Sequence, residues 1–394
     1  MSGAGEQFLE LVRQREIVVC AGSGGVGKTT TSAVVGLNAA IEGQKVLVMT
    51  IDPARRLANS LGIDSLGNEE QQIPLEQFEE VGVSAEGELW AMMLDMKESF
   101  DRIVEQNAPD EETKEAILDN RFYEYFSTSL AGTQEYAAAE RLYEIHRDRD
   151  FDLLVLDTPP TTHALDFLEA PSRMAKAVES KAFQWLYKQD LFKGESGFGL
   201  FSVGSSYVLK TLSRFTGMEL LEEMSVFLRN FAPLLEGFRS RSEEVRNLLT
   251  GESCTFVIVT SPDPHTKDEA MHFYEELGSE RVAVEAFVVN RVHPHWVEES
   301  EFEREPEELA EELVGIDGDL PELDQAGRRR LAEHLLENAA SFYVMAMKDA
   351  RSIQDLEDYL DRDIPIAKVP YFSQDIHSLA GLNRVRTSIF GGGR

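Results

Sequence analysis

Residues 22–30, G-S-G-G-V-G-K-T-T, have the types and spacing of a phosphate-binding loop, G-x-x-x-x-G-K-[ST]. Glycines let the backbone turn tightly, so that successive N–H groups point at phosphate oxygens, and a following helix adds its partial positive charge. In this pattern Lys28 reaches the β- and γ-phosphates and the Thr29 hydroxyl coordinates Mg²⁺. The sequence therefore predicts binding of a nucleoside triphosphate. The predicted ligands in the loop are Gly22, Gly24, Gly25, Val26, Gly27, Lys28, Thr29 and Thr30.

The flanking residues predict the elements that position such a loop. An apolar run over 16–21 indicates a buried parallel strand, and residues 28–41 indicate a helix. Because apolar strands alternate with helical segments, we expect an α/β fold of P-loop NTPase type, a mainly parallel, doubly wound sheet with helical insertions that form a subdomain. The other predicted strands are 45–50, 88–95, 152–160, 255–260, 282–290 and 364–369.

The order of these elements predicts a domain organisation. The P-loop core comprises residues 1–96, 151–169 and 251–394, and residues 97–150 and 170–250 are the helical insertions. Within the core, residues 298–330 are strongly acidic and poor in apolar side chains. We expect this stretch to be a solvated helical excursion or a mobile segment.

Three polar residues follow the carboxyl ends of predicted strands, the edge where ligands bind in open α/β sheets. Asp157 is placed to hold Mg²⁺ opposite Thr29, and Asp52 is placed to orient or deprotonate the attacking water. Asn290 ends a late strand. A lone Asp at the end of a strand more often caps the next helix. Together with the phosphate loop, however, these positions favour a role in nucleotide binding or hydrolysis.

The composition limits the partners. Of 394 residues, 71 are acidic and 38 are Lys or Arg, which gives a formal net charge of −33. Such a field repels a nucleic-acid backbone and no long basic run offsets it, so we expect no nucleic-acid partner. The sequence shows no signal peptide and no uncharged apolar segment that could span a bilayer, which predicts a cytoplasmic protein.

The two cysteines, Cys20 and Cys254, lie far apart in apolar, strand-like runs. We expect both to be buried thiols. There is no C-x-x-C motif and no Cys/His cluster, so the sequence predicts neither a disulfide framework nor a zinc or metalloid site.

At this level of detail the chain resembles the ArsA-type anion-transporting ATPases, a family that includes the ATPases that target tail-anchored membrane proteins. Residues 22–31 and 50–55 carry the resemblance, and residues 157–168 are similar to the family's second switch. Residues 287–291 are similar to the strand whose Asn reads adenine, and residues 369–371 to the loop that covers the base. The resemblance extends over nearly the whole chain and is greatest to bacterial ArsA-family ATPases that lack the signature lysine.

This resemblance implies a cytoplasmic ATPase that uses ATP and Mg²⁺. It implies that Lys28 and Asp52 act in catalysis, that Asn290 and Pro370 contact adenine, and that Thr29 and Asp157 hold the metal. It also implies a dimer in which two nucleotides face each other. Because the chain has a single phosphate loop, whereas the pump subunit carries two fused halves, its partner is an identical chain or a related ATPase.

One departure from the family bears on the mechanism. The family loop reads G-K-G-G-V-G-K-T, and its first lysine reaches the partner's phosphates, whereas this chain has Ser23. A serine cannot stabilise charge on the transferring phosphoryl group. Turnover is therefore slow, or another cation such as Arg55 or Arg56 substitutes, or the partner of a heterodimer supplies the lysine.

An apolar stripe in the second helical insertion has two interpretations. It could form a groove for a hydrophobic client protein, as in the tail-anchored-targeting relatives, or it could pack within the fold, which we favour. Residues 194–206, rich in Gly and Ser, predict a hinge or mobile cover. The stripe consists of Leu220, Met224, Phe227, Phe231, Leu234 and Phe238.

Two other functions stay open. A nucleotide-dependent scaffold or switch that hydrolyses little would be consistent with Ser23. A partition or septum-positioning ATPase usually carries a terminal membrane-binding helix, and residues 381–394 are too short and too rich in glycine at their end for that role.

Overall fold

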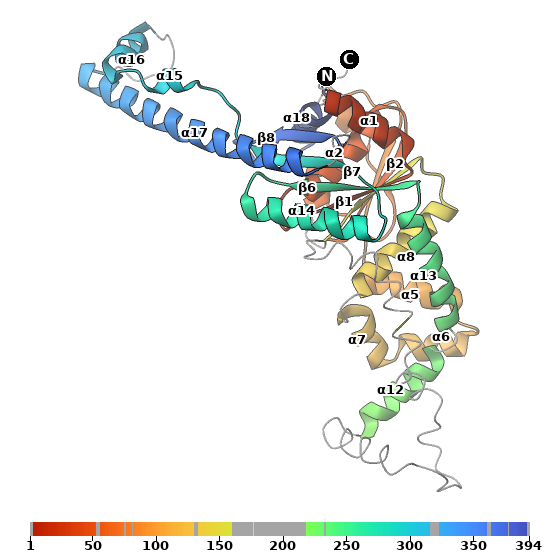
Figure 1. The fold of residues 1–394 in the computed structure, drawn as a ribbon. Coiled ribbons are helices and arrows are strands. Elements are labelled where there is room, and N and C mark those ends of the chain that lie inside the picture. The colour runs from red at the N-terminus through yellow and green to blue at the C-terminus, as the bar shows by residue number, and fades with distance from the viewer. Residues whose placement is uncertain are drawn as a thin grey trace, which may run out of the picture.

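In this computed structural model, a twisted sheet lies at the centre and helices cover both of its faces (Figure 1). The structure describes residues 3–52, 56–74, 76–80, 82–129, 133–159, 176, 218–231, 234–315, 323–360, 364–376 and 378–391. No helix among these residues is both long enough and apolar enough to cross a membrane.

The sheet has eight strands in the order β3-β4-β2-β5-β1-β6-β7-β8. All neighbours are parallel except the short edge strand β3, which is antiparallel to β4. Because the chain leaves β1 toward β2 and later adds β6 on the other side, the carboxyl end of β1 is a topological switch point, where α/β sheets bind ligands. The strands are β1 (Ile17–Ala21), β2 (Lys45–Thr50), β3 (Gln71–Gln72), β4 (Glu88–Met93), β5 (Leu153–Asp157), β6 (Cys254–Thr260), β7 (Val284–Val292) and β8 (Ile366–Pro370).

Alternate side chains of the central strands enter two separate hydrophobic cores. Ile17 and Val19 face one core, whereas Val18 and Cys20 face the other. This alternation follows from the period of two along a strand, and burial on both faces explains why the central strands are continuous apolar runs. Cys20 and Cys254 are both buried and free, as the sequence predicts.

Each core is closed by its own set of helices. The core around Val18 is covered by α1 (Gly3–Gln14), α2 (Lys28–Ile41), α3 (Arg56–Leu61) and α18 (Leu379–Phe390). The core around Ile17 is covered by α5 (Met96–Asn107), α8 (Thr133–Asp148), α13 (Leu234–Thr250), α14 (Pro264–Ser279) and α17 (Gln325–Tyr359).

The helical insertions extend from one side of the sheet (Figure 1). Beyond α5, α8 and α13 lie α6 (Glu111–Leu118), α7 (Arg121–Ser129) and α12 (Met218–Phe231). Phe227, Phe231 and Leu234 of the apolar stripe are buried, and the Phe227 ring packs against Tyr123 of α7 with centroids 6.3 Å apart. These three residues therefore pack within the fold. The side chains of Leu220, Met224 and Phe238, and all of residues 194–206, lie outside the described residues.

A long arm extends in another direction. Its main element is α17, 35 residues long, which contacts α14 and β7 near its C-terminal end. The acidic stretch forms α15 (Glu299–Phe302), α16 (Pro306–Glu312) and the 3₁₀ turn η1 (Leu313–Gly315). Figure 1 shows α16 at the far end of α17, well away from the sheet.

Several boundaries differ from the sequence prediction. β4 ends at Met93 and not at 95, because the Asp95 carboxylate accepts a hydrogen bond from Glu98 N and caps α5. The predicted strands 152–160 and 282–290 are 153–157 and 284–292. No sequence pattern predicted α1, β3, α4 (Glu76–Glu80), α14, α17 or α18 as separate elements.

Candidate nucleotide-binding site

The phosphate-binding loop joins β1 to α2, and its glycines adopt conformations that other residues rarely can. Gly22, Gly25 and Gly27 have φ angles of 149°, 75° and 105°. A Cβ on Gly22 would lie 2.1 Å from the carbonyl oxygen of Val259, and one on Gly27 would lie 2.2 Å from Nδ2 of Asn290. The loop is therefore packed tightly against β6 and β7, with its amides at the N-terminus of α2.

Lys28 is the first residue of α2 and is buried. Its Nζ donates hydrogen bonds to the carbonyl oxygens of Gly22 and Ser23, both at 2.9 Å. Burial lowers the pKa of Lys28, and the negative charges of Asp157 and Asp52 oppose that effect. An ammonium group held inside the loop in this way is suited to binding phosphate oxygens.

Asp157, the last residue of β5, is completely buried beside the loop. Its Oδ2 accepts hydrogen bonds from the hydroxyls of Thr29 and Thr50, both at 2.8 Å. Its Oδ1 is buried and has no hydrogen-bond partner among the described residues. Burial raises the pKa of Asp157 to about 6, although the two hydroxyls and the charge of Lys28 lower it.

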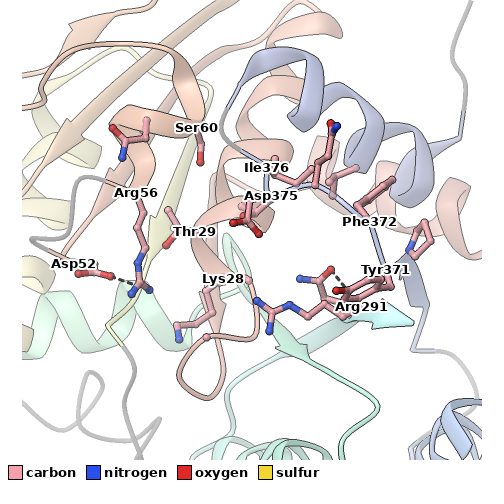
Figure 2. A pocket seen from close by; sticks show the side chains of 18 of the residues that line it. Lys28, Thr29, Asp52, Arg56, Ser60, Arg291, Tyr371, Phe372, Asp375 and Ile376 are labelled. Carbon is pink, nitrogen blue, oxygen red and sulfur yellow. Dashed lines mark hydrogen bonds and ion pairs between the residues drawn. The ribbon is translucent and has the colours of Figure 1, made fainter. Parts of the chain in front are cut away.

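Asp52 is the second residue after β2, at the same edge of the sheet. Nη1 of Arg56, in the first turn of α3, lies 3.6 Å from its Oδ2 (Figure 2). Arg56 is 64 % exposed and lines the cavity, so its guanidinium is available to a ligand. Arg55, the other candidate for the missing cation, lies outside the described residues.

The opposite wall is formed by the ends of β7 and β8. Asn290 Nδ2 donates to the Val26 carbonyl oxygen at 2.8 Å and so ties β7 to the phosphate loop. Pro370 ends β8, and the next residue, Tyr371, donates its N–H to the Val292 carbonyl oxygen at 2.8 Å. Asn290 thus binds the phosphate loop and also lines the cavity.

These walls enclose a cavity of about 630 Å³, within the range of small-molecule sites. Its lining brings together residues from α2, α3, β7, β8 and the segment after β2, which are far apart in sequence (Figure 2). Gly22, Gly24, Val26 and Asp157 belong to the loop or its support and do not line the cavity. The predicted residues that line it are Gly25, Gly27, Lys28, Thr29, Thr30, Asp52, Asn290 and Pro370.

The cavity also contains residues that the sequence analysis did not assign. Arg291 has a positive φ of 61° and points into the cavity from β7, and Tyr371 stacks on His293 at 5.3 Å. Both lie in segments that resemble the family, 287–291 and 369–371, and both directly follow a predicted ligand, Asn290 or Pro370. No motif marks the lining residues Asn59, Ser60, Val385 and 372–376. Thr158 also lines the cavity and belongs to residues 157–168, the segment similar to the family's second switch.

Comparison with known proteins agrees with this geometry. The sequence profile of the anion-transporting ATPase family matches residues 15–316, which include the loop, Asp52, Asp157 and Asn290. The chain belongs to this family. It is accordingly an ATPase, with the α/β fold expected of a P-loop NTPase.

Individual relatives differ in how much of the chain they match. The "Putative arsenical pump-driving ATPase 1" of Aquifex aeolicus is 23% identical over 383 residues, 95% of this chain and 78% of its own length. "ATPase GET3" of Malassezia globosa is 30% identical over 161 residues, 41% of this chain and 44% of its own. The "ATPase ASNA1 homolog" of Cryptosporidium parvum is 26% identical over 274 residues, which are 69% of this chain and 63% of its own length. The match to this chain thus covers less than two thirds of the length of each of the last two relatives.

Membership of this ATPase family implies Mg²⁺ with the nucleotide, and the residues present fit that ion. Mg²⁺ prefers oxygen ligands, and the Thr29 hydroxyl and Asp157 carboxylate lie within hydrogen-bonding distance of each other. The unpartnered Oδ1 of Asp157 is an acceptor that a metal-bound water would satisfy.

The position of the family's signature lysine has a different environment in this chain. The Ser23 hydroxyl donates a hydrogen bond to the carboxylate of Glu269, in α14. Glu269 also lies 3.4 Å from the ring of His265. A neutral side chain bound to a carboxylate supplies no positive charge at this point of the loop.

Proposed function

We propose that this ATPase binds Mg²⁺-ATP in the cavity and hydrolyses it there. The arrangement of Lys28, Thr29 and Asp157 around the loop carries the proposal, because ammonium, hydroxyl and carboxylate stand where phosphates and their metal would require them. Mg²⁺, when bound, neutralises negative charge on the phosphates. Lys28 and the loop amides hold the phosphate oxygens, and Asn290 and Pro370 border the adenine.

Asp52 is the proposed water-positioning residue. It follows a buried strand, so its backbone position is well determined, and its carboxylate faces the cavity beside Arg56. A carboxylate there can accept a hydrogen bond from the attacking water. Arg56 would then stabilise phosphoryl charge in place of the lysine missing at Ser23.

We further propose that the nucleotide bound in the core changes the conformation of the helical insertions. The core comprises residues 1–96, 151–169 and 251–394, and the insertions are residues 97–150 and 170–250. A chain of contacts supports this coupling. α3 lines the cavity, and the segment after it reaches the insertion through two links. Asn68 Oδ1 accepts a hydrogen bond from Ser99 Oγ of α5 at 3.3 Å, and Glu70 pairs with Arg141 of α8 at 3.0 Å.

The proposal includes a dimer, with an identical or related chain as partner, and a cytoplasmic location. A hydrophobic client protein is the candidate ligand of the helical insertions. The burial of Phe227, Phe231 and Leu234 means that these three residues are not the client surface in this conformation.

The decisive test is steady-state ATP hydrolysis across a wide range of protein concentration, with Lys28→Ala as the blank. We expect Lys28→Ala to abolish tight ATP binding, and Asp52→Asn to retain binding while hydrolysis stops. Specific activity that rises with concentration would support a self-sufficient dimer. Unchanged ATP affinity in Lys28→Ala would refute the phosphate-loop assignment.

A second candidate function is a nucleotide-dependent switch with very slow turnover. The contact between Ser23 and Glu269 favours it, because no cation of the loop occupies the signature position. Tight ATP binding with hydrolysis no faster than that of the Lys28→Ala blank would support this switch, or a heterodimer whose partner supplies the lysine.

A further inference from the structure

A carboxylate from a helix outside the phosphate loop is bound directly to the loop. The Ser23 hydroxyl donates a hydrogen bond to Oε2 of Glu269, in α14. The Ser23 carbonyl oxygen accepts a hydrogen bond from Nζ of Lys28 at 2.9 Å. Ser23 is therefore bound through its backbone to the cation of the loop and through its side chain to a negatively charged group.

The fold holds this carboxylate in place, because α14 begins beside the loop. β6 lies next to β1 in the sheet, and α14 follows β6 as the next element of the chain. Asp263 caps α14 by accepting hydrogen bonds from the backbone N–H groups of His265 and Thr266. Thr260 Oγ1 donates to the carbonyl oxygen of Thr266 at 2.9 Å. These hydrogen bonds fix the helix that carries Glu269 against the loop.

The charge of Glu269 is weakly compensated within the described part of the chain. Its one ion-pair neighbour there is the ring of His265, which lies 3.4 Å from Oε1 and is 80 % exposed. No lysine or arginine of the described residues pairs with this carboxylate, which is itself 40 % exposed. An exposed pair of this kind contributes little, so the negative charge still acts on the loop.

This location matters because the loop has to attract phosphate oxygens. Like charges repel, and at physiological ionic strength screening acts over a Debye length of about 8 Å. A carboxylate hydrogen-bonded to the loop is therefore only partly screened from a ligand of that loop. Since a nucleoside triphosphate carries more negative charge than the diphosphate, this carboxylate disfavours the triphosphate more strongly.

The contact also has a second interpretation, in which Glu269 only holds the loop in shape. A neutral acceptor would serve that purpose equally well, because a hydroxyl can donate to an amide oxygen as it does to a carboxylate. Glutamine has the shape of glutamate and keeps an acceptor oxygen. The substitution Glu269→Gln therefore separates the effect of the charge from that of the contact.

We propose that Glu269 determines the relative affinity of the site for ATP and ADP by placing a negative charge against the phosphate loop. This inference rests on the proposed function, since it requires that the cavity binds these nucleotides. Neither Ser23 nor Glu269 lines the cavity, so the effect is electrostatic and needs no contact with the nucleotide. In consequence the site binds ATP less tightly than its loop alone would allow, and ADP is favoured relative to ATP.

Isothermal titration calorimetry with Mg²⁺ and either ADP or the non-hydrolysable β,γ-imido analogue of ATP tests the inference. We expect Glu269→Gln to raise the affinity for the analogue about fivefold and that for ADP no more than about twofold. In molar NaCl the gain for the analogue should fall below about twofold, because salt screens the repulsion. No gain for the analogue, an equal gain for both nucleotides, or a gain that salt does not reduce would overturn the inference.

Two control variants separate the charge of Glu269 from other effects. Asp268→Asn removes the same charge from the preceding residue of α14, whose side chain is 73 % exposed, and should change either affinity by less than about twofold. Ser23→Ala removes the hydrogen bond but keeps the carboxylate, so it should not raise the affinity for the analogue. A rise in Ser23→Ala as large as that in Glu269→Gln would refute the role of the charge.

Lys28→Ala distinguishes a failure of this inference from a failure of the proposed function. If the wild type binds both nucleotides and Lys28→Ala binds neither, the phosphate-loop assignment holds, and unchanged affinities in Glu269→Gln refute only the role of Glu269. If the wild type binds neither nucleotide, both proposals fail. Near-UV circular dichroism like that of the wild type shows that each variant is folded.

Discussion

Asp157 combines complete burial with a negative charge, and this combination is costly in the absence of a cation. Its pKa is raised from 3.8 to about 6, so the folded protein binds the proton more tightly than the unfolded chain. Such a difference corresponds to about 3 kcal/mol of destabilisation once the group is ionised in both states. The site is therefore adapted to binding and not to stability.

We predict that Asp157→Asn is more stable than the wild type in the absence of nucleotide and Mg²⁺. The gain should reach up to about 3 kcal/mol at pH 8 and about half of that at pH 5, because the wild-type penalty develops as the pH rises from about 4 to about 6. Urea unfolding with EDTA at both pH values measures it. The control is Asp152→Asn, an exposed residue just before the same strand. A gain of equal size at both pH values would contradict this account.

At the scale of elements, the phosphate loop depends on its glycines for two separate reasons. Gly27 has a left-handed conformation and its missing Cβ would overlap Asn290. Gly25 is also left-handed, but a Cβ there would meet nothing within 4 Å. Comparing the two separates backbone strain from the close approach of β7.

We predict that Gly27→Ala lowers ATP affinity at least about tenfold, since Asn290 and the loop must both move. Gly25→Ala should lower it less than Gly27→Ala does, because in the nucleotide-free protein its Cβ meets no other group and adds conformational strain of about 1 kcal/mol. Isothermal titration calorimetry measures both. Equal effects would show that the approach of Asn290 to the loop is unimportant.

A buried ion pair joins α8 to the segment before β3. Arg141 is 2 % exposed and lies 3.0 Å from Glu70 and 2.8 Å from Glu144. We predict that Arg141→Ala destabilises the protein by about 3–5 kcal/mol, because it leaves Glu70 buried with less compensation. The control Arg147→Ala removes an exposed pair with Asp148 and should cost less than about 1 kcal/mol. Similar urea midpoints for the two variants would exclude this role for Arg141.

At the scale of the whole molecule, net charge opposes compactness. A formal charge of −33 on 394 residues makes the folded state repel itself, and salt screens that repulsion. The repulsion acts on the α15–α16 region as well, where eight glutamates lie between positions 299 and 312.

We predict that the midpoint of thermal unfolding rises by at least a few degrees between low and molar NaCl. KCl at equal ionic strength should produce the same rise, because screening does not depend on the identity of the cation. Differential scanning calorimetry measures both series. A midpoint that stays constant or falls would show that self-repulsion does not limit stability.

The α/β architecture and the centre of the site could be predicted from the sequence, because their determinants are local. The apolar strands, the loop glycines and the strand-end positions of Asp52, Asp157 and Asn290 are visible as short patterns. β1, α2 and β2 match those patterns closely, since buried central strands must be continuously apolar. The missed elements are edge or covering elements such as β3, α1 and α18, whose patterns are weak.

Only the tertiary structure decided which distant residues share the cavity and which surfaces stay uncovered. Arg291, Tyr371 and Asn59 border the nucleotide site because strand order brings β7, β8 and α3 together, and no local pattern records that order. The same holds for Ser23 and Glu269, 246 positions apart in sequence. The sequence also does not determine that Phe227 is buried and Val344 is exposed. An apolar helix face has the same sequence pattern whether or not the fold covers it.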